Sequence, residues 1–111
     1  MHYLFSYGTL QLEKVQLETY GRLLKGFEDS LPGYKLFDIE IKDAEVLKKS
    51  SQKFHPIAVK SHCHIDKVNG KIFEITEEEL KATDQYEVED YKRVMEKFES
   101  GQKAWVYVAN I

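Results

Sequence analysis

Four carboxylates fall within seven positions late in the chain, at Asp84, Glu87, Glu89 and Asp90. A charge run of this kind is most often the solvated end of a helix, and that interpretation stays open. However, Asp84 and Glu87 are three residues apart, a spacing that puts two side chains on one face of a helix. The segment is therefore a candidate for acid-base chemistry.

Two tyrosines, Tyr86 and Tyr91, flank this run. If they screened one of the carboxylates from water, its pKa would rise toward neutrality, because burial disfavours the charged form. A carboxyl group with a pKa near the working pH is what a general base requires.

A second candidate is the sequence Tyr7-Gly8-Thr9-Leu10, where strand-like residues run into a glycine and then a small hydroxyl residue. A strand that ends in this way often does so because its backbone has a special task at that point. The alternative is an ordinary turn at the end of a strand.

The run His62-Cys63-His64 raises the question of a metal site. In a strand, His62 and His64 share a face while Cys63 points to the other, so the three cannot easily meet one ion. Zinc needs three or four ligands, and the rest would have to come from His55 or from an acid elsewhere. We therefore expect a half-exposed strand here and no metal. Nothing nearby in sequence would activate the Cys63 thiol as a nucleophile.

The elements that must position these residues can be placed from periodicity and turn signals. One short helix is expected after Gly8, ending at Gly21, and another from a capping box at Thr76 and Glu79 to about Tyr86. Pro32-Gly33 predicts a turn, and the strand that follows it is expected to be the second half of a hairpin. Residues 42–53 are polar and predict a loop. Gly70 is expected to let another backbone approach closely. Strands are expected at 2–7, 34–41, 54–60 (at a sheet edge) and 68–75, and at 91–98 and 104–108 as a hairpin turning at Ser100-Gly101.

These strands do not alternate regularly with long helices, which argues against a doubly wound parallel sheet. The pattern predicts an α+β fold with a small, mixed, mostly antiparallel, barrel-like sheet and short helices. With 111 residues, of which 42% are hydrophobic, the chain is expected to form a single domain over residues 1–111.

The charge and cysteine content narrow the classes of partner and compartment. Sixteen basic and nineteen acidic residues give a net charge of -3, which gives no reason to expect nucleic acid or a membrane surface as a partner. A single cysteine fits a reducing compartment, and no apolar run reaches membrane-spanning length. The amino terminus does not read as a signal peptide. We therefore expect a cytoplasmic protein.

Taken together, the two candidate segments resemble motifs of the gamma-glutamylcyclotransferase-like family. Tyr7-Gly8-Thr9-Leu10 resembles its glycine-turn signature, and Asp84-Gln85-Tyr86-Glu87, followed by Tyr91 and Arg93, resembles its acidic motif. Three further segments are similar to family strands and occur in the same order: Leu31-Pro32-Gly33-Tyr34-Lys35-Leu36, Val68-Asn69-Gly70-Lys71-Ile72-Phe73 and Ala104-Trp105-Val106-Tyr107-Val108.

The resemblance implies a mixed barrel-like fold with a cavity at one end and a defined reaction. The family cyclises a gamma-glutamyl group to 5-oxoproline and releases the attached amine or amino acid, a step of glutathione metabolism. Neither a metal nor another cofactor is implied, and the expected partner is a small gamma-glutamyl compound. The oligomeric state is left open between a monomer and a weak homodimer.

The resemblance also assigns roles to individual residues. Glu87 matches the catalytic acid/base, which would take a proton from the substrate's alpha-ammonium and return it to the departing amine. The glycine corner would point backbone N–H groups into a concavity to hold a carboxylate or oxyanion. Tyr107 would contact the substrate, orient Glu87 or simply wall the cavity. The expected substrate-binding residues are Tyr7, Gly8, Thr9, Leu10, Tyr91 and Tyr107.

Two features near Glu87 bear on this assignment. Family members often have glycine directly after the catalytic glutamate, whereas this chain has Val88, which changes the backbone freedom of the loop. Glu89 and Asp90 would add negative charge that raises the pKa of Glu87 further or repels an anionic substrate. The alternatives are a non-catalytic module that keeps the cavity, and a different intramolecular amide or ester rearrangement that uses the same glutamate.

Overall fold

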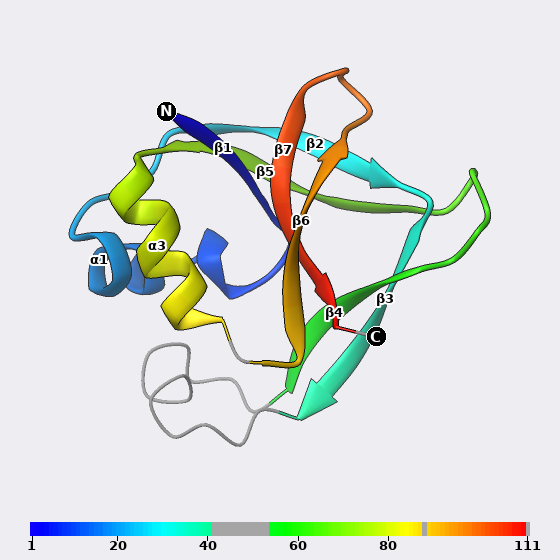
Figure 1. Cartoon of the computed structure of the whole chain (residues 1–111), viewed down its shortest axis with the longest axis horizontal. Helices are drawn as coiled ribbons and strands as arrows, with labels where there is room; N and C mark the ends of the chain where they lie inside the picture. The colour runs from blue at the N-terminus through cyan, green and yellow to red at the C-terminus, as the bar shows by residue number, and fades with distance from the viewer. Residues whose placement is uncertain (41–53, 88, 111) are drawn as a thin grey trace.

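The structure, a computed structural model, describes residues 1–40, 54–87 and 89–110, and its elements confirm the predicted α+β class (Figure 1). The polar segment predicted as a loop at 42–53 lies outside these residues. Neither α-helix in the described part of the chain is long and apolar enough to cross a membrane. The elements are β1 (His2–Ser6), the 3-10 turn η1 (Thr9–Gln11), α1 (Glu13–Tyr20), β2 (Gly26–Pro32), β3 (Tyr34–Glu40), β4 (Phe54–Lys60), β5 (Lys67–Ile75), α3 (Glu77–Tyr86), β6 (Tyr91–Lys97) and β7 (Lys103–Ala109).

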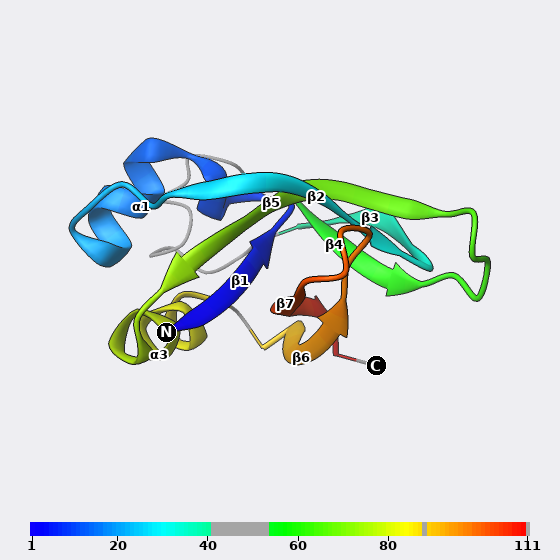
Figure 2. The ribbon, with the colours of Figure 1, turned by 90° about the horizontal axis from the view of Figure 1, so that it is seen from above.

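Five of the strands form one sheet in the order β2-β5-β1-β7-β6, and β3 and β4 form a separate two-stranded ribbon. The pairing is antiparallel except between β1 and β7, which run parallel. Figure 2 shows the helices gathered at one end of the sheet and the β3–β4 ribbon toward the other. Because β1 is the central strand, the corner that follows it emerges in the middle of the molecule.

The sheet is not closed into a barrel, contrary to the expectation from sequence. To close the barrel, another strand would have to pair with the free edge of β4 through backbone hydrogen bonds. Two backbone groups of β4 are instead hydrogen-bonded to tyrosine hydroxyls. Ala58 N–H donates to the Tyr7 hydroxyl at 3.0 Å, and the Tyr91 hydroxyl donates to the Pro56 carbonyl at 2.7 Å. Pro56 also lacks an N–H for a ladder. Side chains therefore bridge the seam that strand pairing leaves open.

The turn at Pro32-Gly33 is present, but β2 and β3 do not form the predicted hairpin. β2 pairs with β5 and β3 pairs with β4. Both backbone groups of Gly33 are held by the β4–β5 connection, since its N–H donates to the Asp66 carbonyl and its carbonyl accepts from Ser61 N–H. The chain therefore passes from the sheet into the ribbon at this point instead of folding back on itself.

Helix α3 begins at the predicted capping box and ends where the candidate acid follows. Thr76 Oγ1 accepts from Glu79 N–H at 3.1 Å, and Thr76 N–H donates to the Glu79 carboxylate at 2.9 Å. These two bonds satisfy donors that would otherwise be unpaired at the start of a helix. The last helical residue is Tyr86, so Glu87 is the first residue after the final turn of α3.

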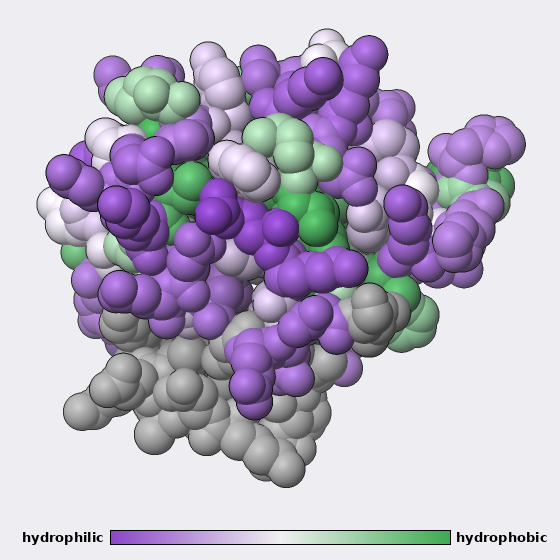
Figure 3. Space-filling view, viewed as in Figure 1, coloured by the Kyte–Doolittle hydropathy of each residue, from purple (hydrophilic) through white to green (hydrophobic). Residues whose placement is uncertain are grey.

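The hydrophobic core lies on both faces of β1. Leu4 packs with residues of both helices, and Phe5, its neighbour, packs in a second cluster with residues of β3, β4 and β5. Gly70 fits this arrangement as predicted, because a Cβ there would lie 2.3 Å from the Ser6 carbonyl oxygen and 2.7 Å from the Phe5 ring. On the face shown in Figure 3, hydrophilic side chains cover most of the surface and apolar residues show only in small patches.

Candidate active site

A hollow at the end of β1 brings together the two segments that the sequence singled out. Its lining contains all seven predicted site residues, which come from the β1 corner, the end of α3 and the β6–β7 hairpin. Its volume is about 30 Å³, which is room for one or two water molecules. The lining residues are Phe5, Ser6, Tyr7, Gly8, Thr9, Leu10, Pro56, Glu87, Tyr91 and Tyr107.

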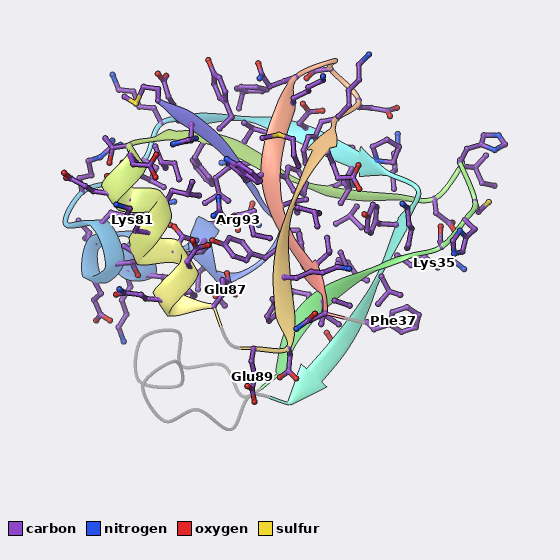
Figure 4. The ribbon with its side chains drawn as sticks, in the orientation of Figure 1. Lys35, Phe37, Lys81, Glu87, Glu89 and Arg93 are labelled. Carbon is purple, nitrogen blue, oxygen red and sulfur yellow. The ribbon has the colours of Figure 1, made fainter. Side chains whose placement is uncertain are left out.

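Glu87 enters the hollow because the helix stops one residue before it. Its backbone is extended (φ -73°, ψ 136°), while its N–H still donates to the Thr83 carbonyl at 3.0 Å. In Figure 4, Glu87 lies between the end of α3 and the strands, and Glu89 points away from them. The expectation that Asp84 and Glu87 share a helical face is therefore wrong, since Glu87 is not part of the helix.

Burial raises the pKa of the Glu87 carboxyl group from 4.5 to about 8. The residue is half-buried, and its side chain accepts no hydrogen bond from the residues that the structure describes. Burial is the cause of the shift, so the predicted contribution of Glu89 and Asp90 to this pKa is not needed. Val88, the departure from the family pattern, lies outside the described residues.

Three tyrosines of the lining surround this carboxyl group. Burial raises the pKa of Tyr7, Tyr91 and Tyr107 above its usual value of 10, and the negative charge of Glu87 raises each pKa further. All three hydroxyls therefore stay protonated at neutral pH. Each proton is held by a protein oxygen: Tyr7 donates to the Tyr107 carbonyl at 2.5 Å, Tyr91 to the Pro56 carbonyl at 2.7 Å and Tyr107 to Asp84 Oδ1 at 2.5 Å.

The predicted role of Tyr86 as a wall beside the acid is not what the structure shows. Tyr86 is buried in the core, and its hydroxyl is 2.8 Å from that of Thr9, behind the corner. Leu10 likewise packs in the core, while its carbonyl accepts from the Gln16 side chain. Thr9 and Leu10 thus face the core with their side chains. Their backbone N–H groups have no hydrogen-bond partner among the described residues, as is usual at the start of a helical turn.

The glycine at the corner is not required by backbone strain or by lack of space. Gly8 has φ -135°, which lies outside the left-handed region, and an added Cβ would be 3.4 Å from Pro56 Cγ. The corner exists as predicted, but the conformational freedom of glycine does not explain it. What Gly8 provides here is a flat surface against Pro56 at the rim of the hollow.

Sequence reasoning missed several contributors to the site. Pro56 is recognisable only as an edge-strand residue, and nothing in its local sequence points to a hollow assembled from distant segments. Asp84 stands out in the sequence as a carboxylate, but its partners do not: Arg93 Nε lies 3.0 Å from Asp84 Oδ1, and the guanidinium stacks 4.4 Å from the centre of the Trp105 ring.

The run His62-Cys63-His64 lies in the connection between β4 and β5, not in a strand as predicted. Ser61 Oγ accepts from Cys63 N–H at 3.2 Å, a local turn that competes with strand pairing, and His62 has φ 62°. Across residues 1–40, 54–87 and 89–110, no group of three metal-binding side chains comes together.

The fold is similar to that of solved proteins at low sequence identity. One Arabidopsis thaliana protein matches with a TM-score of 0.75 at 23% identity, over 98% of this chain and 68% of that one. A second matches with a TM-score of 0.71 at 25% identity, over 97% of this chain and 61% of that one. A structure named gamma-glutamyl cyclotransferase matches with a TM-score of 0.75 at 17% identity, over 98% of this chain and 66% of that one. The chain thus spans about two thirds of the length of these structures. No curated protein sequence matches it significantly.

The sequence profile of one family extends over nearly the whole chain. That profile, gamma-glutamyl cyclotransferase, AIG2-like, matches residues 4–111, which include most of β1, its corner, α3, Glu87 and the β6–β7 hairpin. With this match and the shared fold, the chain belongs to the AIG2-like gamma-glutamyl cyclotransferase family.

Proposed function

We propose that the protein is a gamma-glutamyl cyclotransferase that converts a small gamma-glutamyl amide into 5-oxoproline and a free amine or amino acid. The observation that carries the proposal is the placement of Glu87, a carboxyl group with a raised pKa, in one hollow with the β1 corner. The single cysteine fits activity in the reducing cytoplasm.

The reaction needs little chemistry from the protein because it is intramolecular. The substrate's alpha-amine attacks its own gamma-carbonyl carbon, a five-membered lactam closes, and the bond to the leaving nitrogen breaks. Holding the substrate in a bent conformation supplies much of the acceleration, up to about 7 to 11 kcal/mol for the best-oriented intramolecular reactions. The remaining requirement is to move one proton from the attacking nitrogen to the leaving nitrogen.

Glu87 is suited to that transfer. With a pKa of about 8, it is present in both protonation states near neutral pH. The ionised form takes a proton from the alpha-ammonium, and the protonated form then gives it to the departing amine. No cationic side chain is among the lining residues that the structure describes. The N–H groups of Thr9 and Leu10 therefore donate the hydrogen bonds that hold the substrate's alpha-carboxylate and the oxyanion formed during the reaction.

The size of the hollow sets a further condition. A volume of about 30 Å³ holds one or two waters, less than a gamma-glutamyl group occupies, so the walls must move for the substrate to enter. The same observation favours a second candidate function, a non-catalytic module that binds a small anion or a part of a larger ligand.

Turnover of a panel of gamma-glutamyl amino acids and gamma-glutamylamines, with 5-oxoproline measured by mass spectrometry, separates the two candidates. We expect product with the wild type, a loss of about a hundredfold or more in the Glu87→Gln variant, and little change in Glu89→Gln. Below pH 8, kcat/KM is expected to rise about tenfold per pH unit and then level off, because the base must be ionised. Undiminished turnover by Glu87→Gln would exclude the role of Glu87, and binding without any product would favour the module.

A further inference from the structure

The hydroxyl of Tyr107 has its proton fixed from outside the hollow. It donates to Asp84 Oδ1 at 2.5 Å, and the same oxygen lies 3.0 Å from Arg93 Nε. Arg93 can only donate, and its guanidinium is held against the Trp105 ring. Asp84 is therefore oriented as an acceptor for both groups, and Tyr107 has no second proton to offer a ligand.

We propose that Asp84 is a positioning residue that turns the Tyr107 oxygen into a hydrogen-bond acceptor, so that the hollow selects a ligand carrying an ammonium group at this point. The inference deepens the proposed function, on which it rests for the identity of the substrate's reacting end. It assigns a task to Asp84, which does not line the hollow itself.

The hydroxyls of the other two tyrosines in the lining, Tyr7 and Tyr91, support the same polarity. The proton of Tyr7 goes to the Tyr107 carbonyl and that of Tyr91 to the Pro56 carbonyl. A phenol has one proton and two lone pairs, so once its proton is committed it can only accept from a ligand. The three tyrosine oxygens and the carboxylate form of Glu87 are therefore acceptors, while the N–H groups of Thr9 and Leu10, which have no partner among the described residues, are donors.

A ligand that suits this arrangement carries an ammonium and a carboxylate on neighbouring atoms. The ammonium has three protons for the tyrosine oxygens and Glu87, and the carboxylate accepts from the backbone corner. A ligand of the same shape without the ammonium leaves the acceptors unpaired. Hydrogen bonds to charged groups of this kind correspond to roughly a tenfold to hundredfold change in affinity.

A purely structural role for Asp84 is the competing hypothesis, because the pair with Arg93 also ties α3 to β6. A matched control is available on the same helix. Arg22 makes two hydrogen bonds to the Glu79 carboxylate, at 2.7 and 2.8 Å, and neither residue lines the hollow. Glu79→Gln weakens that tie without touching Tyr107, and glutamine still serves in the capping box.

The test compares the binding of L-glutamate and glutarate by isothermal titration calorimetry at neutral pH. The two ligands share both carboxylates and the carbon chain, and only L-glutamate has the ammonium. We expect the wild type, Glu79→Gln and Asp84→Asn to bind L-glutamate at least tenfold more tightly than glutarate. The Asp84→Asn variant keeps the preference because the amide oxygen of asparagine still accepts from Tyr107 and Arg93 without carrying a charge.

In Asp84→Ala the Tyr107 proton is released toward the hollow. We therefore expect L-glutamate to bind about tenfold or more weakly, glutarate to bind as well as or better than before, and the preference to fall to within about threefold. Tyr107→Phe should lose the preference too, and adding it to Asp84→Ala should have no further effect on the preference. If Asp84→Ala does not fold, Tyr107→Phe and Asp84→Asn still give opposite expected results.

Three results would overturn the inference: equal affinity of the wild type for the two ligands, no binding of either, or an equal weakening of both in Asp84→Ala, which marks a structural role. The ligands contain no gamma-amide bond, so a protein that binds them as expected but forms no 5-oxoproline refutes only the proposed function. A protein that forms 5-oxoproline without the ammonium preference refutes only the role of Asp84.

Discussion

Replacing Glu87 with glutamine is expected to stabilise the fold at alkaline pH. The folded state binds the Glu87 proton more tightly than the unfolded state, because burial raises the pKa from 4.5 to about 8. The stability that this group contributes is therefore full below pH 4.5 and is lost as the pH rises toward 8. A glutamine of nearly the same shape carries no charge at any pH and escapes this loss.

The magnitude follows from the two pKa values. Each tenfold difference in proton affinity is worth about 1.4 kcal/mol, so a rise from 4.5 to about 8 corresponds to at most about 5 kcal/mol. Glu87 is only half-buried, and contact with solvent in the hollow reduces this figure. We expect Glu87→Gln to raise the free energy of unfolding by about 2 to 4 kcal/mol at pH 8.5 and by less than about 0.5 kcal/mol at pH 4.5.

Urea unfolding of both proteins at pH 4.5, 6, 7 and 8.5 measures this difference, and other titrating groups cancel in the comparison. Glu89→Gln is the matched control, since Glu89 is exposed and points away from the strands (Figure 4); it should change stability by less than about 0.5 kcal/mol throughout. A difference between Glu87→Gln and the wild type that is constant with pH, or that shrinks as the pH rises, would refute the burial of this carboxyl group.

Three further predictions concern the elements around the hollow. Tyr7→Phe should lower the free energy of unfolding in urea by about 2 to 4 kcal/mol, because it leaves Ala58 N–H and the Tyr107 carbonyl unpaired. Tyr91→Phe leaves only the Pro56 carbonyl unpaired and should lower it by about 1 kcal/mol. Equal effects of the two variants would contradict the proposed bridging of the seam. Gly70→Ala should lower stability by about 3 kcal/mol, because its Cβ would meet the backbone of β1, and a thermal melt within a degree or two of the wild type would speak against that contact. Thr76→Ala should remove about 1 kcal/mol through the lost cap, and Thr76→Ser should restore most of it, both measured by thermal unfolding.

The elements that could be predicted from sequence are those whose signals are local. The capping box at Thr76 and Glu79 depends on residues three positions apart, and the β6–β7 hairpin depends on the turn that joins its own strands. The close approach at Gly70 was also predictable, since a glycine within a strand pattern often marks a bulge or a place where another backbone comes near.

The pairing of β3 could not be predicted, because a turn at Pro32-Gly33 looks the same whether the chain folds back or passes into another layer. What decides between them is the pair of bonds from Gly33 to the distant β4–β5 connection. The open seam was missed for the same reason: the hydroxyls of Tyr7 and Tyr91 that occupy the edge of β4 lie far from it in sequence.

Residues that line the hollow were predicted from the sequence, but the contacts among the residues of the candidate site were not. Resemblance to a family named Glu87 and the β1 corner, and the structure brings them to one hollow. Helical spacing suggested that Asp84 and Glu87 act side by side. The helix ends at Tyr86, so Glu87 turns into the hollow, while Asp84 contacts Arg93 and Tyr107. Roles in turnover stay predictions for all of these residues, as does the expected set of partners.

The parallel contact between β1 and β7 joins strands from the two ends of the described chain. A ribosome that has made β1, its corner and α3 has therefore not yet made the hollow, because Tyr107 and β7, the strand that carries it, are synthesised after α3. In an incomplete chain, Glu87 would be exposed to water, its carboxyl group would have a pKa near its usual value, and no hollow would be present to hold a ligand. The raised pKa of this carboxyl group is thus acquired only with the tertiary structure that buries it.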